Sequence, residues 1–79
     1  MFKTSYTQEE SEELLRWIDT KPTGEIDLGE GIYIKNIAYF CSQMRSIVEK
    51  RYKHPAFAGQ MEVIVRLKEA YEKMKKNEK

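Results

Sequence analysis

The stretch from residue 36 to residue 48 constrains the fold of this chain more than any other segment. Its apolar side chains recur at steps of three and four residues, which is the spacing of one face of an α-helix. These residues are Ile37, Phe40, Cys41, Met44, Ile47 and Val48. Asn36 precedes them as a favoured N-cap, and the cations of residues 50–53 suit the negative end of a helix dipole. We therefore expect a helix from about residue 37 to Tyr52.

An earlier helix is indicated by the sequence Thr7-Gln8-Glu9-Glu10. It has the form of a capping box, in which a hydroxyl and a carboxylate three residues later satisfy free backbone amides. The apolar face that follows consists of Leu14, Leu15, Trp17 and Ile18. Lys21-Pro22-Thr23-Gly24 ends this helix, because the residue before a proline avoids the α conformation.

A last helix follows a corner at His54-Pro55, since proline is tolerated at the first position of a helix. Its apolar residues form two adjoining stripes. One stripe has Phe57, Met61, Ile64 and Tyr71, and the other has Val63, Leu67, Ala70 and Met74. One neighbouring helix does not cover so wide a face, so the helix either contacts two helices or self-associates. We expect the polar tail, residues 73–79, to fray.

Residues 25–34 link the first two helices and alternate apolar with polar side chains around two glycines. A small β-hairpin and an extended hook both fit this pattern. A lone two-stranded ribbon is marginal in water, so the segment has to lie against helices, and we favour the hook. The predicted fold is mainly α: a three-helix bundle with a short extended segment or small β-hairpin between the first and second helices.

The length of 79 residues allows one small globular domain over residues 1–79, with a core of about residues 7–74. So short a chain needs nearly every apolar residue for its core, which argues against a deep catalytic cleft. The predicted core consists of Leu14, Trp17, Ile18, Ile26, Leu28, Ile34, Phe40, Met44, Val48, Phe57, Met61, Ile64, Leu67 and Tyr71.

Charge is distributed unevenly although the formal net charge is only +1. Residues 1–30 carry eight acids and three bases, whereas residues 31–79 carry five acids and eleven bases. Either the two parts complement each other within the fold, or the basic part meets an anionic partner. We favour the first explanation, because charges in one small domain lie within about 10 Å, the Debye length.

No catalytic or metal-binding set emerges from the residue types and their spacing. Cys41 and His54 lie on one predicted helix, roughly 20 Å apart at 1.5 Å per residue, beyond proton-transfer reach. Cys41 lies on an apolar stripe and is expected to be buried. One histidine and one cysteine cannot form a tetrahedral zinc site. We expect no enzyme activity, no metal and no cofactor.

The single cysteine cannot form an internal disulfide, which favours a reducing compartment. No apolar run reaches the roughly 20 residues of a membrane span, and the first residues do not resemble a signal peptide. We therefore expect a cytoplasmic protein without a membrane partner.

Two surfaces are candidates for function. The first is a basic surface that could contact phosphates while a tyrosine stacks on a base, made of Arg45, Lys50, Arg51, Tyr52, Lys53 and His54. The second is an interaction surface on the last helix, made of Val63, Leu67, Ala70 and Met74. Tyr33 and Tyr39 fall off the predicted apolar faces, and exposed tyrosines are favoured at protein interfaces.

These surfaces define two functional hypotheses. The preferred one is a small non-catalytic protein-interaction or adaptor module, with a homodimer through the last helix as one form of it. The alternative is a weak nucleic-acid-binding domain that uses the basic end of the second helix. Salt separates them, because phosphate contacts weaken as salt rises and an apolar interface persists.

Several residues also occur in an order that resembles a known family. They are Glu25-Ile26-x-Leu28, Gly31, Ile34, Asn36, Phe40, His54-Pro55-x-Phe57 and Arg66-Leu67. The chain resembles a family of small uncharacterised bacterial helical domains over about residues 14–74. Where that family has an acid at the helix cap, this chain has Asn36, which caps without charge. The resemblance implies a helical fold with an extended hook and implies no reaction, ligand or partner.

Overall fold

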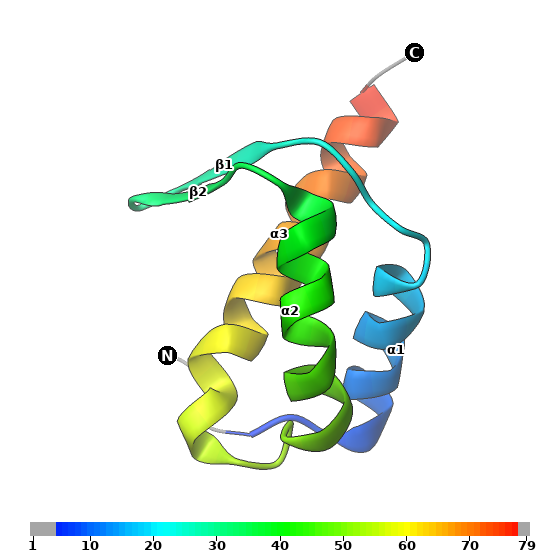
Figure 1. Cartoon of the computed structure of the whole chain (residues 1–79), viewed down its shortest axis with the longest axis vertical. Coiled ribbons are helices and arrows are strands. Elements are labelled where there is room, and N and C mark those ends of the chain that lie inside the picture. The colour runs from blue at the N-terminus through cyan, green and yellow to red at the C-terminus, as the bar shows by residue number, and fades with distance from the viewer. Residues whose placement is uncertain (1–4, 78–79) are drawn as a thin grey trace.

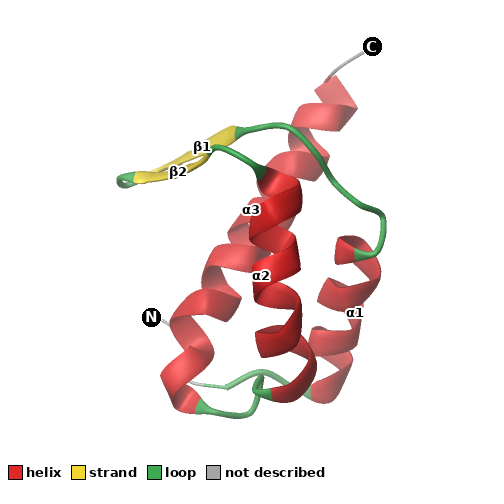
Figure 2. Cartoon of the chain, viewed as in Figure 1, coloured by secondary structure: helices red, strands yellow, loops and turns green. Residues whose placement is uncertain are grey.

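The local caps place the helices of the computed structural model, which describes residues 5–77 (Figures 1 and 2). The Thr7 hydroxyl accepts the Glu10 N–H, and the Glu10 carboxylate accepts the Thr7 N–H. This predicted capping box is confirmed. The helices are α1 (Gln8–Ile18), α2 (Ile37–Lys50), the short 3-10 helix η1 (Pro55–Phe57) and α3 (Ala58–Asn77).

Side chains and backbone groups outside α2 form hydrogen bonds with the free backbone N–H and C=O groups at its two ends. At its start, the Asn36 side chain accepts the Tyr39 N–H, and the Gly24 carbonyl accepts the Ile37 N–H at 2.9 Å. Near its end, the buried Ser11 hydroxyl of α1 donates to the Val48 carbonyl, one of the last four that a helix leaves unpaired. The N-cap is confirmed, and the helix ends two residues before the predicted Tyr52.

The linker between α1 and α2 is a β-hairpin, so the extended hook that we favoured is wrong. Strands β1 (Ile26–Gly29) and β2 (Ile32–Ile34) pair antiparallel, with Asp27 opposite Tyr33. A two-residue turn joins them, in which Glu30 and Gly31 both have positive φ, as a type I′ turn requires. The hairpin lies across α3, and Arg66 of α3 binds Glu30 at the turn. The hairpin thus lies against a helix, as a two-stranded ribbon needs in water.

The three helices pack side by side, with the hairpin at one end of the bundle (Figure 1). α3 contacts α1, α2 and β1, which accounts for its wide apolar face. It continues as a helix to Asn77, so the predicted fraying from Lys73 is not seen over residues 73–77. Residues 78 and 79 lie outside the described part of the chain.

The core differs from the predicted set at its edges. Its fully buried centre is drawn from all three helices and consists of Ser11, Ile37, Val48, Met61, Ile64 and Leu67. The prediction missed Tyr6 and Ile37. Tyr6 directly precedes the N-cap of α1, and Ile37 is the first residue of α2. Other predicted core residues are only half-buried, because they belong to the hairpin or lie at the bundle margin: Ile26, Leu28, Phe40, Met44, Phe57 and Tyr71.

Ion pairs join the acidic first part of the chain to the basic second part. Arg45 binds Asp19, Arg66 binds Glu30 at 2.8 Å, and Lys68 binds Glu13 at 3.5 Å. Each of these cations also lies within 4 Å of a carboxylate four residues away on its own helix. The expected charge complementarity within the fold is confirmed. Within residues 5–77, no helix is long and apolar enough to cross a membrane.

Candidate interaction surfaces

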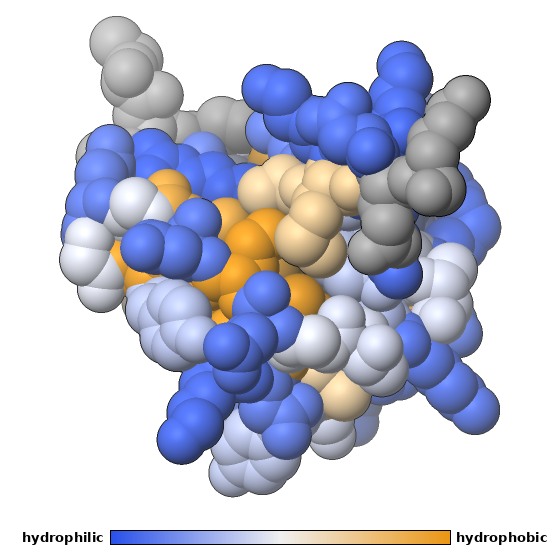
Figure 3. All heavy atoms as spheres, turned by 90° about the horizontal axis from the view of Figure 1, so that it is seen from above, coloured by the Kyte–Doolittle hydropathy of each residue, from blue (hydrophilic) through white to orange (hydrophobic). Residues whose placement is uncertain are grey.

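An open groove lies between β2 and α2, with a volume of about 720 Å³. Small-molecule pockets commonly enclose several hundred Å³. This groove has that volume but is shallow and largely open to solvent, so it suits a segment lying on the surface. The hairpin side contributes six consecutive residues, 31–36, and α2 contributes Tyr39, Phe40, Gln43 and Met44. Seen from the hairpin end, apolar surface gathers in the middle of the molecule and is bordered by hydrophilic side chains (Figure 3).

Two tyrosines of this groove are the most exposed large hydrophobic side chains among the described residues. Tyr33 is 56% exposed and Tyr39 is 64% exposed. The Tyr33 hydroxyl donates to Glu25 at 2.7 Å, and this hydrogen bond raises the pKa of Tyr33. The half-buried side chains of Ile32, Phe40 and Met44 line the same groove and supply its apolar surface. Together they form a semi-exposed surface of the composition that protein interfaces favour.

The groove also borders a strand edge. β2 pairs with β1 alone within the described residues, and no residue of β1 lines the groove. The groove therefore lies on the side of β2 that has no strand partner. Lys35 is the only charged side chain among the groove residues, which makes the site weakly positive.

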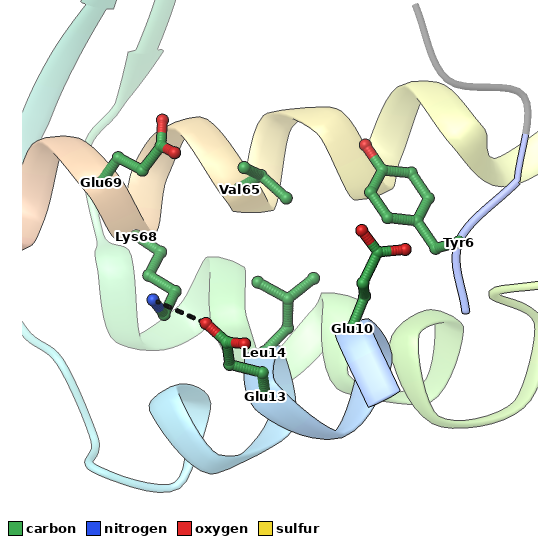
Figure 4. A pocket seen from close by; sticks show the side chains of 7 residues that line it. All are labelled: Tyr6, Glu10, Glu13, Leu14, Val65, Lys68 and Glu69. Carbon is green, nitrogen blue, oxygen red and sulfur yellow. Dashed lines mark ion pairs between the residues drawn. The ribbon is translucent and has the colours of Figure 1, made fainter. Parts of the chain in front are cut away.

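A smaller pocket lies between α1 and α3 (Figure 4). Its volume of about 160 Å³ is below the range of typical ligand sites. Several of its polar groups already have partners: Lys68 binds Glu13, and the Tyr6 hydroxyl donates to Glu62 at 3.1 Å. Burial raises the pKa of Tyr6 to about 12, which keeps this hydroxyl protonated. The pocket is a packing crevice between two helices.

The interaction surface predicted on α3 is divided between the core and the exterior. Leu67 is 0% exposed, so it packs inside the bundle and cannot meet a partner. Val63 and Ala70 are half-buried, and Met74 is 39% exposed. The two apolar stripes of α3 face the other elements of this chain, and little of them remains for self-association.

The residues of the predicted basic surface do not all lie together. Arg45 points to α1, where it binds Asp19, and it also contacts Glu49 at 3.7 Å. The rest form a continuous stretch, residues 50–54, which we call the basic segment; it begins at the last residue of α2, at the end of the bundle opposite the hairpin (Figure 1). Arg45 is therefore paired with carboxylates of this chain and does not belong to the basic segment.

Aromatic rings hold the basic segment in place. The Arg51 guanidinium lies 5.3 Å from the centroid of the Phe57 ring, and the Lys53 ammonium lies 5.8 Å from that of Tyr52. The exposed His54 meets the Phe57 ring edge-on at 6.2 Å. Tyr52 is half-buried against the core and lies beside Lys53, so it serves as an anchor and is poorly placed to stack on a base.

The residues considered for chemistry lie apart. Cys41 is buried, as expected, and burial raises the pKa of its thiol to about 11. His54 is exposed in the basic segment beyond the end of α2. Over residues 5–77, no group of three or more His, Cys, Asp or Glu side chains is arranged to hold a metal ion.

Comparisons with known proteins do not indicate a function for this chain. No family model matches the sequence, and comparisons with curated proteins and with solved structures find no match. The resemblance to small bacterial helical domains stays a prediction.

Proposed function

We propose that the chain is a small non-catalytic protein-interaction module that binds an extended segment of a partner protein in the groove between β2 and α2. The observation that carries the proposal is the pair of exposed tyrosines, Tyr33 and Tyr39, which line one groove together with half-buried apolar side chains. Contiguous exposed apolar surface of this kind marks interaction sites in small proteins.

An extended segment fits the groove because β2 offers an edge without a strand partner. A peptide that adds to such an edge gains backbone hydrogen bonds, and its alternate side chains enter the pockets beside the strand. Here those side chains would meet Ile32, Phe40 and Met44. The single charge of the groove, on Lys35, favours a carboxylate on the partner. The occupant is therefore an extended apolar segment that carries an acidic residue.

Selection from a displayed library of short random peptides tests this proposal. The comparison variant is Tyr39→Glu, which places a charge in the groove. Tyr39 is the third residue of α2, and with Asn36 as the N-cap a glutamate there completes a capping box, so the variant is expected to fold. Peptides with alternating apolar residues and an acid should be enriched on the unmodified protein and lost on Tyr39→Glu.

Met74→Glu is the matched control, because it adds the same charge to an exposed position of α3 outside the groove. Enriched peptides should bind this variant as they bind the unmodified protein. Absence of enrichment, or equal binding to Tyr39→Glu, contradicts the proposal. The solution mass identifies one particular partner: a salt-insensitive dimer that Tyr39→Glu converts to a monomer means that a second copy of the chain fills the groove.

A further inference from the structure

We infer that the basic segment, residues 50–54, is a second binding site that contacts the phosphate backbone of a nucleic acid. The inference starts from a contrast among the cations. Arg45, Arg66 and Lys68 each bind two carboxylates of this chain. By contrast, Lys50, Arg51 and Lys53 are exposed, and no carboxylate within residues 5–77 forms an ion pair with them.

The acids nearest to the basic segment in the sequence do not pair with it. No acidic residue occurs in the sequence between Glu49 and Glu62. The Glu49 carboxylate lies 3.7 Å from Arg45, and Glu62 accepts the Tyr6 hydroxyl and lies near Arg66. The nearest acids in the sequence are thus directed to other partners, and the cations of the segment stay without an ion pair, although α1 begins with its acidic first turn at the same end of the bundle (Figure 1).

The segment is also partly ordered before it binds. Contacts of Arg51 with Phe57 and of Lys53 with Tyr52 restrict two long side chains without neutralising them. Side chains that are already restricted lose less conformational entropy when they bind an anion. An arginine held in this way retains the N–H donors that match a phosphate group.

The chemistry of the segment favours a nucleic acid over an acidic protein. The rings of Tyr52 and Phe57 are half-buried and lie beside the cations of the segment, so affinity has to come from charge. A nucleic acid gives the larger gain, because its densely spaced phosphates release counterions when cations bind. Contacts to phosphates alone do not read sequence, so the binding is expected to be sequence-independent.

The basic segment and the groove are separate sites. The segment begins at the last residue of α2, whereas the groove is formed by the first half of α2 and β2 (Figure 1). Failure of one proposal therefore leaves the other untouched.

Fluorescence anisotropy with labelled single-stranded and double-stranded DNA at low salt tests the inference. The test variant is Lys50→Gln/Lys53→Gln, and the matched control is Lys73→Gln/Lys76→Gln, which removes two exposed lysines from α3. The test variant should bind roughly tenfold more weakly, and its slope of log affinity against log salt on double-stranded DNA should be smaller by about 1.8. The control should stay within about twofold of the unmodified protein.

Three outcomes overturn the inference. The first is no binding of either DNA at low salt. The second is an equal loss in both lysine variants, which means that net charge and not the segment attracts DNA. The third is binding of poly-glutamate as tightly as DNA, which identifies an acidic protein as the partner.

Discussion

The interior of the bundle and the groove beside β2 contain the same kinds of side chain and differ in how completely these are covered. In the interior, Ile37 and Leu67 are 0% exposed, because helices enclose them from several sides. In the groove, Ile32, Phe40 and Met44 keep part of their surface exposed, because only β2 and α2 border it.

This difference separates stability from binding. Burial of apolar surface stabilises a fold by about 25 cal/mol per Å², so the covered interior carries most of the stability of this small domain. The apolar surface that stays exposed in the groove adds no burial free energy to the stability of the isolated chain. Covering it with a partner segment would yield the same gain at the moment of binding.

Truncation of a buried and a groove side chain should have very different costs. Leu67→Ala is expected to lower the free energy of unfolding by about 3 kcal/mol or more, because it leaves a cavity that helices cannot close. In a domain with roughly 5 kcal/mol of total stability, this nearly unfolds the protein. Met44→Ala should cost roughly 1 kcal/mol, because Met44 is only half-buried. Urea denaturation of both variants measures the gap, and equal costs would break the comparison.

Cysteine labelling can compare the two faces of α2 directly. Cys41 is buried, and its thiol has a pKa of about 11, so it should react with an alkylating reagent roughly 100-fold more slowly than a free thiol near pH 8. A cysteine at the exposed position 39, made as Tyr39→Cys in a Cys41→Ala background, should react at the rate of a free thiol. Similar rates at both positions would show that Cys41 is as accessible as position 39, and that α2 has no buried face.

The hydrogen bond between α1 and α2 adds a smaller contribution to the interior. Ser11→Ala leaves the buried Val48 carbonyl without the Ser11 hydroxyl, which should lower the free energy of unfolding by about 1–2 kcal/mol. Ser46→Ala, at an exposed position of α2, is the control and should have almost no effect. Thermal unfolding compares the two. A Ser11→Ala protein as stable as the control would mean that this contact adds nothing to the bundle.

The ion pair at the hairpin turn should have the smallest effect of all. Arg66 holds the pKa of the Glu30 carboxyl below its usual value, through a hydrogen bond first and charge second. The folded state therefore gains stability above the ordinary glutamate pKa and loses it as pH falls through the lowered folded value. The difference in unfolding between the unmodified protein and Glu30→Gln should be slight near neutral pH and vanish in acid. A difference that grows in acid contradicts this sign.

Features set by neighbouring residues could be predicted from the sequence. The Thr7 capping box, the Asn36 N-cap and the Pro55 corner each depend on a few adjacent residues, and each is confirmed. Features set by distant contacts could not. The choice between hook and hairpin depends on support from α3, which includes the ion pair of Arg66 with Glu30 across 36 positions.

The candidate site shows the same limit. Exposure of Tyr33 and Tyr39 could be predicted, because both fall off the apolar pattern of their elements. The groove could not, since its walls come from β2 and from the outer side of α2, and Phe40 and Met44 follow the same spacing as fully buried residues. Spacing identifies an apolar face, but only the packed structure shows which part of that face is left open.

The measurement that tests the account most directly is the Tyr39→Glu variant, with its unfolding free energy and its peptide binding determined on the same sample. The account predicts that the stability stays within about 0.5 kcal/mol of the unmodified protein, as for other exposed substitutions, and that binding of the selected peptides is lost. A protein that keeps its peptide binding, or one that loses several kcal/mol of stability, would contradict the separation of a stabilising interior from a binding groove.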